Sequence, residues 1–360
     1  MTTNLCLLIS VSLLGGSIAA QQPPAGVQPN RPSPIAQAEL VRRLSTSLDS
    51  LAKAGQFSGV TMLAKNGAPV FQRAYGMANR ERTIPNNLET AFNLGSINKA
   101  FTQIAILQLS AAGKLDLDSA LAVYWPDYPN DAVAREVTIR QLMRHTSGIG
   151  GDIFDSPPGG TRHDVRNLKD YLALFVNEPP RFEPGARNAY SNAGYVVLGL
   201  LIERLSGQDY YTYVREHIFE PAGMTRTGSF FVDSLPLNTA IGYTTGREDA
   251  PPGAPLHPNT QELPGRGSSA GGGYSTAQDL LKFLKALRDH RIANGLPAGL
   301  GIAGGSGGIN AVVEGDLPGG YDLIVLTNLD PPAAERVARM TREWLGVRDE
   351  RGPGARGPRR

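Results

Sequence analysis

Apolar residues between positions 35 and 55 recur at the spacing of one helix face, and Gly55 fits a C-cap. The next apolar runs, 57–64 and 70–75, are rich in strand formers and flank an Asn-Gly pair at 66–67. Asn-Gly between such runs is the strongest short hairpin signal. The pattern therefore predicts an N-terminal helix followed by two antiparallel strands.

The middle of the chain has a helical pattern. Residues 96–112 (SINKAFTQIAILQLSAA) are apolar on nearly every face and stop at Gly113, as expected for a helix buried inside the domain. Between 114 and 267 Pro and Gly are frequent, and the clearest helices fall at 168–176 and 195–205. We predict an inserted helical region over about 114–267.

The C-terminal part returns to strand patterns. A helix is predicted at 279–287, strands at 311–314 and 322–328, and a closing amphipathic helix at 333–345. The predicted fold class is α+β, with an antiparallel sheet built from both chain ends, flanked by helices, beside the all-helical insertion.

Both ends of the chain differ in composition from this domain, which we place at 35–346. The apolar run 5–18, followed by small residues, is typical of a signal peptide over 1–20. Residues 21–34 hold five prolines and predict an extended linker, and the basic tail 347–360 is expected to be disordered. These features predict export to the periplasm or the medium. A short membrane anchor and a cytoplasmic location are the alternatives.

Composition narrows the classes of function. Of 360 residues, 41% are hydrophobic and 19% charged, so a sizeable core can be buried. The formal charge of +2 gives no field for a phosphate backbone, which argues against nucleic acid as a partner. Cys6 is the only cysteine, and the five histidines are isolated in the sequence. We therefore expect no disulfide, no metal and no cofactor.

Several catalytic patterns in this glycine-rich chain are best explained by coincidence. Gly-x-Ser-x-Gly occurs at 267–271 and 304–308, but neither lies between a strand and a helix with Asp and then His downstream. A GxGxxG pattern at 299–304 precedes a strand instead of a helix, so the N-terminus that would hold a pyrophosphate is missing.

Ser-x-x-Lys occurs twice, and the settings differ. Ser50 and Lys53 lie in an amphipathic segment where the lysine would be solvated. Ser96 opens the apolar helix, where its backbone N–H is one of the unpaired donors at the positive end of the helix dipole. Lys99 shares its face one turn later. A lysine buried there is more readily neutral and can help to activate the serine hydroxyl.

Tyr-x-Asn also occurs twice. The copy at 128–130 sits in a turn with proline, whereas Tyr190 and Asn192 immediately precede a second apolar helix. A tyrosine held beside Lys99 could take the proton from Ser96. Asn192 could align a substrate amide or the lysine.

Together these residues resemble the serine β-lactamase and penicillin-binding-protein-like hydrolases, in the branch with Tyr-x-Asn as second motif. That branch includes class C β-lactamases, D,D-peptidases and many esterases. The likeness covers roughly residues 36–346 and implies a sheet from both chain ends beside a helical region that carries Tyr190. Further matches are 73–76 (RAYG), 142–148 (LMRHTSG), 182–185 (FEPG), 220–224 (EPAGM), 272–276 (GGYST) and 327–332 (TNLDPP).

The third motif of the family, Lys or His followed by a small residue and Gly, departs from the pattern. In that register the chain has Ile302, Ala303 and Gly304, so an aliphatic side chain replaces the cation. The resemblance implies that Gly305 supplies the second oxyanion N–H, a backbone group that survives the change. Ala303, Gly304, Gly305 and Asn192 are the predicted substrate-binding residues. The lost cation would bind a substrate carboxylate, which argues against an efficient β-lactamase or peptidase.

The sequence thus predicts a serine hydrolase that cleaves a small-molecule ester or amide through an acyl-enzyme on Ser96, and an esterase fits best. Ser96, Lys99 and Tyr190 are the predicted catalytic residues. His145 resembles part of a loop that buttresses the site, and we interpret it as structural. The alternatives are a non-catalytic ligand- or peptidoglycan-binding protein on the same fold and a weak β-lactamase or D,D-peptidase.

Overall fold

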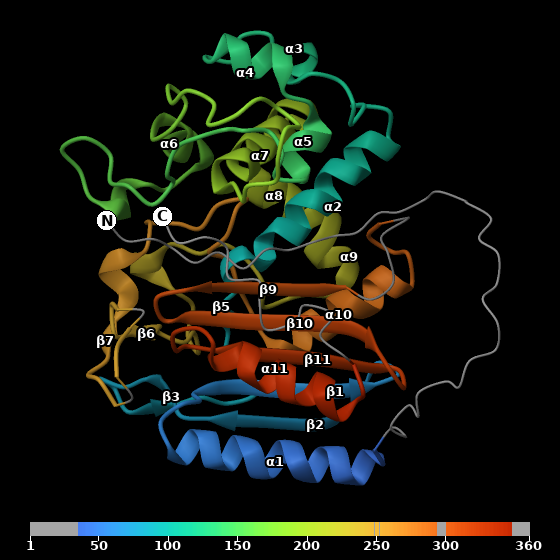
Figure 1. Cartoon of the computed structure of the whole chain (residues 1–360), viewed down its shortest axis with the longest axis vertical. Helices are drawn as coiled ribbons and strands as arrows, with labels where there is room; N and C mark the ends of the chain where they lie inside the picture. The colour runs from blue at the N-terminus through green and yellow to red at the C-terminus, as the bar shows by residue number, and fades with distance from the viewer. Residues whose placement is uncertain (1–34, 248, 252, 294–299, 348–360) are drawn as a thin grey trace.

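A five-stranded antiparallel sheet with the order β2-β1-β11-β10-β9 forms the centre of the molecule (Figure 1). The computed structural model describes residues 35–247, 249–251, 253–293 and 300–347. The strands are β1 (Gly59–Lys65), β2 (Ala68–Tyr75), β9 (Gly301–Ser306), β10 (Ile309–Leu317) and β11 (Tyr321–Thr327). Because β1 pairs directly with β11, the two ends of the domain meet in the middle of the sheet, as predicted.

One face of the sheet is covered by the two terminal helices, α1 (Gln37–Lys53) and α11 (Ala333–Trp344), which contact each other (Figure 1). In α1 the buried residues Leu40, Leu44 and Leu48 are spaced four apart, so one stripe packs on the strands. The predicted hairpin is also present. Asn66 and Gly67 both have positive φ, the conformation that a two-residue hairpin turn of this kind needs.

The other face of the sheet packs on α10 (Ala277–Arg288) and belongs to the larger core. This core continues into the helical region through α2 (Asn98–Ala111), which is buried on nearly every side. Its position explains the apolar sequence of 96–112, since α2 has helices on one side and strands on the other (Figure 1). The residues that precede α2 therefore lie between the sheet and the helical region.

The helical region lies above the sheet in Figure 1. Its α-helices are α3 (Leu121–Tyr124), α4 (Asp131–Glu136), α5 (Ile139–Met143), α6 (Leu168–Ala173), α7 (Asn192–Ser206), α8 (Tyr210–Val214) and α9 (Glu220–Ala222). From 223 to 267 the described residues form no α-helix and contain the short strands β6 (Tyr243–Thr244) and β7 (His257–Pro258). The remaining short strands are β3 (Met77–Asn79), β4 (Ile84–Pro85), β5 (Phe92–Asn93) and β8 (Tyr274–Ser275).

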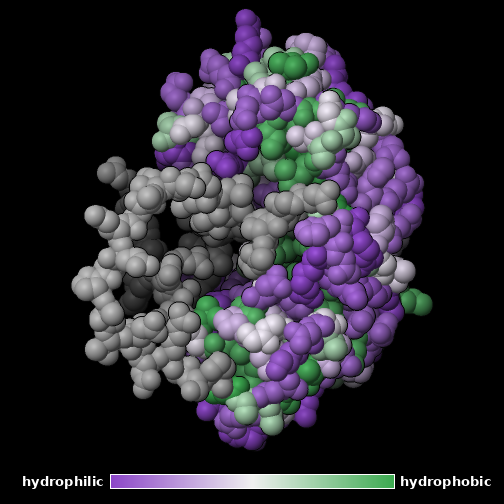
Figure 2. Space-filling view, turned by 90° about the vertical axis from the view of Figure 1, so that its right-hand side faces the viewer, coloured by the Kyte–Doolittle hydropathy of each residue, from purple (hydrophilic) through white to green (hydrophobic). Residues whose placement is uncertain are grey.

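The predicted signal peptide, linker and basic tail lie outside the described residues. Within the described part, no helix is long and apolar enough to cross a bilayer. The surface in Figure 2 is mainly hydrophilic, with hydrophobic residues in separate small patches. Where the described residues are visible in this view, they form no broad apolar face.

Candidate active site

Ser96 lies in a 3-10 turn (Gly95–Ile97) that runs directly into α2. The sequence predicted that the α-helix itself opens at Ser96, whereas the first regular turn begins two residues later. The difference comes from Gly95, whose positive φ of 50° turns the chain before the helix. The side-chain oxygen of Asn93 accepts the N–H of Gly95 at 2.9 Å and holds this turn. Ser96 itself is half-buried.

Lys99 follows one turn later and points back at the serine. Its Nζ lies 3.2 Å from Ser96 Oγ, and the side chain is only 2% exposed. Nζ also donates to Asn192 Oδ1 at 2.7 Å and to the carbonyl oxygen of Ala270 at 2.5 Å. Because amide and carbonyl oxygens only accept, these bonds fix the direction of the amine. The lysine is thereby held against the hydroxyl.

Tyr190 reaches the same oxygen from the helical region. Its Oη is hydrogen-bonded to Ser96 Oγ at 2.6 Å across a sequence separation of 94 residues. Lys99 Nζ lies 4.7 Å from the centre of the Tyr190 ring, so its charge also faces the aromatic π-system. Ser191 caps α7 by accepting the N–H of Gly194 at 3.0 Å. Tyr-x-Asn therefore spans the junction between loop and helix, with Asn192 as the first residue of α7.

His145 lies behind Tyr190. Its ring stacks on the Tyr190 ring with centroids 4.5 Å apart, and its Nδ1 accepts the N–H of Ser191. Burial and the positive charge of Lys99 lower the pKa of His145 to about 3. The imidazole is therefore neutral at ordinary pH.

Strand β9 closes the other side of the serine. A Cβ on Gly304 would lie 2.1 Å from the oxygen of Leu94 and 2.7 Å from the nitrogen of Ser96. A Cβ on Gly95 would lie 3.0 Å from the nitrogen of Gly305. Backbones approach this closely only where glycine removes the side chains. The amides of Ser96 and Gly305 consequently lie near each other, where two N–H donors could hold an oxyanion.

The two residues before Gly304 point to opposite faces of β9. Ile302 is 4% exposed and belongs to the larger core, on the face that meets the serine turn. Ala303 packs with the core beneath α1 and α11. Because successive residues of a strand alternate between faces, the side chain of Ala303 lies on the face away from the serine turn, and its predicted contact with substrate stays a prediction.

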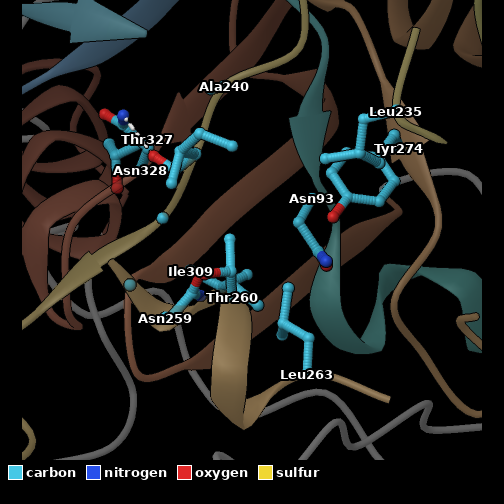
Figure 3. A pocket seen from close by; sticks show the side chains of 13 residues that line it. Asn93, Leu235, Ala240, Asn259, Thr260, Leu263, Tyr274, Ile309, Thr327 and Asn328 are labelled. Carbon is cyan, nitrogen blue, oxygen red and sulfur yellow. Dashed lines mark hydrogen bonds between the residues drawn. The ribbon is translucent and has the colours of Figure 1, made fainter. Parts of the chain in front are cut away.

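A small cavity lies beside the nucleophile turn (Figure 3). Asn93, the residue that holds Gly95, forms part of its wall opposite Asn259 and Ile309. The free volume of about 10 Å³ matches a single water molecule. The cavity is too small for an acyl group.

The serine patterns set aside in the sequence lie in other settings. Ser269 is completely buried and donates to the carbonyl oxygen of Tyr195 at 2.8 Å, which leaves it no access to a substrate. Lys53, partner of the other Ser-x-x-Lys serine, is exposed at the end of α1. Among the described residues, no three His, Cys, Asp or Glu side chains converge as a metal site would require.

Sequence reasoning missed the backbone carbonyl group that holds Lys99. The carbonyl oxygen of Ala270 accepts a hydrogen bond from Lys99 at 2.5 Å. The glycines that follow Ala270 allow the backbone to pack closely against the serine turn. A Cβ on Gly271 would lie 3.0 Å from the oxygen of Gly95. The signal was the run of glycines at 271–273, which indicates close backbone approach and does not say which carbonyl faces the lysine.

This chain is similar in sequence to a known protein family and to proteins with given names. A family model described as Beta-lactamase matches residues 44–348. Esterase EstB of Burkholderia gladioli is 31% identical over 343 residues, which cover 86% of this chain and 86% of that protein. Putative penicillin-binding protein PbpX of Bacillus subtilis (strain 168) is 35% identical over 236 residues. That match covers 66% of this chain and 56% of PbpX.

Solved structures show the same architecture. The crystal structure of a penicillin-binding protein from Bacillus halodurans superimposes with a TM-score of 0.70 at 31% identity. The match covers 81% of this chain and 98% of that chain. The similarity therefore extends over nearly the whole of that protein and includes both the sheet and the helical region.

Proposed function

The chain belongs to the beta-lactamase family, and from this premise we propose that it hydrolyses an ester through an acyl-enzyme on Ser96. One observation carries the proposal. The oxygen of Ser96 is contacted at the same time by Tyr190 Oη at 2.6 Å and by Lys99 Nζ at 3.2 Å. In the structure both groups donate to Ser96 Oγ. Once Tyr190 is a phenolate, the same contact makes it the base that activates the nucleophile.

In the proposed reaction, Ser96 Oγ attacks the carbonyl carbon while its proton passes to Tyr190. The charge of Lys99 stabilises the phenolate that accepts this proton. The carbonyl oxygen becomes an oxyanion and receives hydrogen bonds from the amides of Ser96 and Gly305. The tetrahedral intermediate collapses as Tyr190 returns the proton to the departing alkoxide. Water then attacks the acyl group along the reverse route and frees Ser96.

We infer the substrate class from the absence of a cation at position 302, where this chain has Ile302 in place of the Lys or His of the family motif. An aliphatic side chain on this face offers no charge for a substrate carboxylate. A neutral ester needs no such partner, and the similarity to a protein named an esterase supports the same class. Asn192 and the Gly305 amide are the groups we assign to substrate binding.

A second candidate function rests on the similarity to proteins named penicillin-binding proteins. The chain spans 56% of the length of PbpX, so the matched part alone supports this candidate. Acylation by a β-lactam, with slow release, would use the same Ser96, Lys99 and Tyr190. The missing cation at Ile302 would make this reaction inefficient.

Intact-mass spectrometry tests both candidates. The purified chain is incubated with neutral p-nitrophenyl esters, with a fluorophosphonate and with a panel of penicillins. We expect ester turnover and a single fluorophosphonate adduct that disappear in Ser96→Ala and persist in Ser306→Ala, a serine next to Gly305 on β9. Ester hydrolysis by Ser96→Ala at the wild-type rate would rule out the proposed nucleophile. A wild-type chain that forms no adduct would instead indicate a non-catalytic binding protein.

Export to the periplasm or the medium remains part of the proposal. It rests on the apolar run 5–18 and on the small residues that follow it. N-terminal sequencing of the protein purified from its native cells would check it. A mature chain that begins near residue 21 supports export, and a chain that retains residues 1–20 contradicts it.

A further inference from the structure

The loop that carries Tyr190 rests on three consecutive residues at the end of α5. Gly185 donates its N–H to the oxygen of Thr146 at 2.7 Å, and Asn188 Nδ2 donates to the oxygen of Arg144 at 2.8 Å. Residues 185–188 are exposed, so neighbouring side chains contribute little to holding this loop. The segment 144–146 is therefore the platform that determines where the loop lies.

His145 is the middle residue of this platform. It accepts hydrogen bonds from the residue before Tyr190 and from the residue after it. The residue before the tyrosine, Ala189, donates its N–H to the carbonyl oxygen of His145 at 2.8 Å. The residue after it, Ser191, donates its N–H to Nδ1 of the imidazole at 3.1 Å. The same imidazole stacks on the tyrosine ring at an interplanar angle of 26°. Three contacts from one residue thus fix the position of the phenol.

Resting on the proposed function, we infer that His145 is a positioning residue that keeps the phenol of Tyr190 in its proton-transfer position. The imidazole does this as a neutral ring with its hydrogen on Nε2, because Nδ1 accepts a hydrogen bond. A protonated imidazole would present N–H to N–H at Ser191 and add a second positive charge near Lys99. His145 exchanges no proton with the substrate.

The backbone of His145 supports a specific role. Its φ of +58° is left-handed, a conformation that is uncommon for residues other than glycine and in which histidine, like asparagine and aspartate, is enriched. The residue is also only 5% exposed. In this conformation the carbonyl group of His145 accepts the N–H of Ala189 while its ring accepts the N–H of Ser191.

Kinetics of three variants separate positioning from simple packing. His145→Asn keeps an acceptor near Nδ1 and tolerates the left-handed backbone but loses the stack. His145→Phe keeps a ring and loses the acceptor, and His145→Ala loses both. We expect the acylation rate with a neutral p-nitrophenyl ester to fall about 100-fold in the Ala variant and about 10-fold in the Asn variant, on the scale of a misplaced catalytic group. KM should stay within about threefold, because the phenol acts in the transition state.

The matched control is His217, a second histidine stacked on a tyrosine, with ring centroids 4.2 Å apart from Tyr213. His217→Ala should retain the wild-type rate. Thermal unfolding identifies variants that do not fold, and the milder Asn variant then provides the comparison. A folded His145→Ala with unchanged acylation would overturn the inference and leave the proposed function intact. A wild-type chain that neither turns over the ester nor reacts with the fluorophosphonate would overturn the proposed function, and the inference with it.

Discussion

Gly304 lies so close to Ser96 that a Cβ on the glycine would stand 2.7 Å from the amide nitrogen of the serine. A real Cβ essentially never comes this near to a backbone atom, and the other obstacle, the oxygen of Leu94 at 2.1 Å, is also backbone. Neither atom can rotate away. The distance between β9 and the nucleophile turn is therefore set by the absence of a side chain.

Gly304→Ala should push β9 away from the turn and separate the two candidate oxyanion donors. Losing one such donor typically costs 10²–10³-fold in rate, and we expect a loss of about 100-fold or more in kcat/KM for esters. Gly301→Ala is the control on the same strand, because a Cβ there meets no atom within 4 Å. Equal activity of the two variants would contradict the proposed oxyanion site.

Tyr190→Phe removes the hydroxyl that contacts Ser96 and leaves the stacked ring in place. Because general acid–base groups contribute roughly 10²–10⁴-fold, kcat should fall by about this factor with little change in KM. Tyr195→Phe is the matched control, since its hydroxyl donates to the oxygen of Met143. A steady-state ester assay measures kcat and KM for both variants. If kcat of Tyr190→Phe fell by less than threefold, Lys99 alone would have to serve as the base.

Ile302→Lys should restore a cation on the face of β9 that meets Ser96. We expect penicillin to acylate Ser96 at least about tenfold faster, measured by intact mass. The free energy of unfolding should fall by about 1–3 kcal/mol, since a core residue is replaced. Ala303→Lys puts the same charge on the opposite face and should give no gain. An equal gain in both variants would indicate a general charge effect.

Acid should destabilise the protein through His145. Its pKa is about 3 in the folded chain, against 6.5 for an unperturbed histidine, so between these values the unfolded chain binds a proton that the folded chain does not. The free energy of unfolding therefore decreases as the pH falls through this window, by about 1.4 kcal/mol per pH unit. Between pH 7 and pH 4.5 this amounts to about 2–3 kcal/mol.

His145→Asn does not titrate in this window, so the acid-dependent loss should be smaller in the variant by that amount. Urea unfolding at the two pH values measures the difference and cancels the contributions of the other ionisable groups. Parallel curves for His145→Asn and wild type would show that the imidazole is not held neutral by the fold.

Local patterns account for the parts of the fold that were predicted correctly. α1, the Asn66-Gly67 hairpin and α11 follow from periodicity and turn chemistry within a few residues. The stretch 223–267 was wrongly included in an all-helical insertion. Its Pro and Gly residues break both the helical and the strand period, so only contacts with distant residues give it a shape.

The candidate site divides in the same way. Ser96 and Lys99 are one helical turn apart, so their proximity follows from the sequence. Tyr190 comes from a sequence separation of 94 residues, so its place in the same cleft was predicted from its motif beside an apolar helix and from the family resemblance, and not from local spacing. The carbonyl of Ala270 was not predictable, because every residue has one and no residue type marks the carbonyl that faces an amine. The motif fixes the place of Ala303 in the chain and not its face of β9, so its orientation came only from the structure.

The pairing of β1 with β11 and of β10 with β9 has a consequence for biosynthesis. A growing polypeptide on the ribosome contains Ser96, Lys99 and Tyr190 long before it contains Gly305. Until the last strands emerge and close the long loop between them and β1, the oxyanion donors cannot come together. Hydrolytic activity should therefore arise only after almost the entire chain has been translated. A fragment that ends before β9 should not hydrolyse esters.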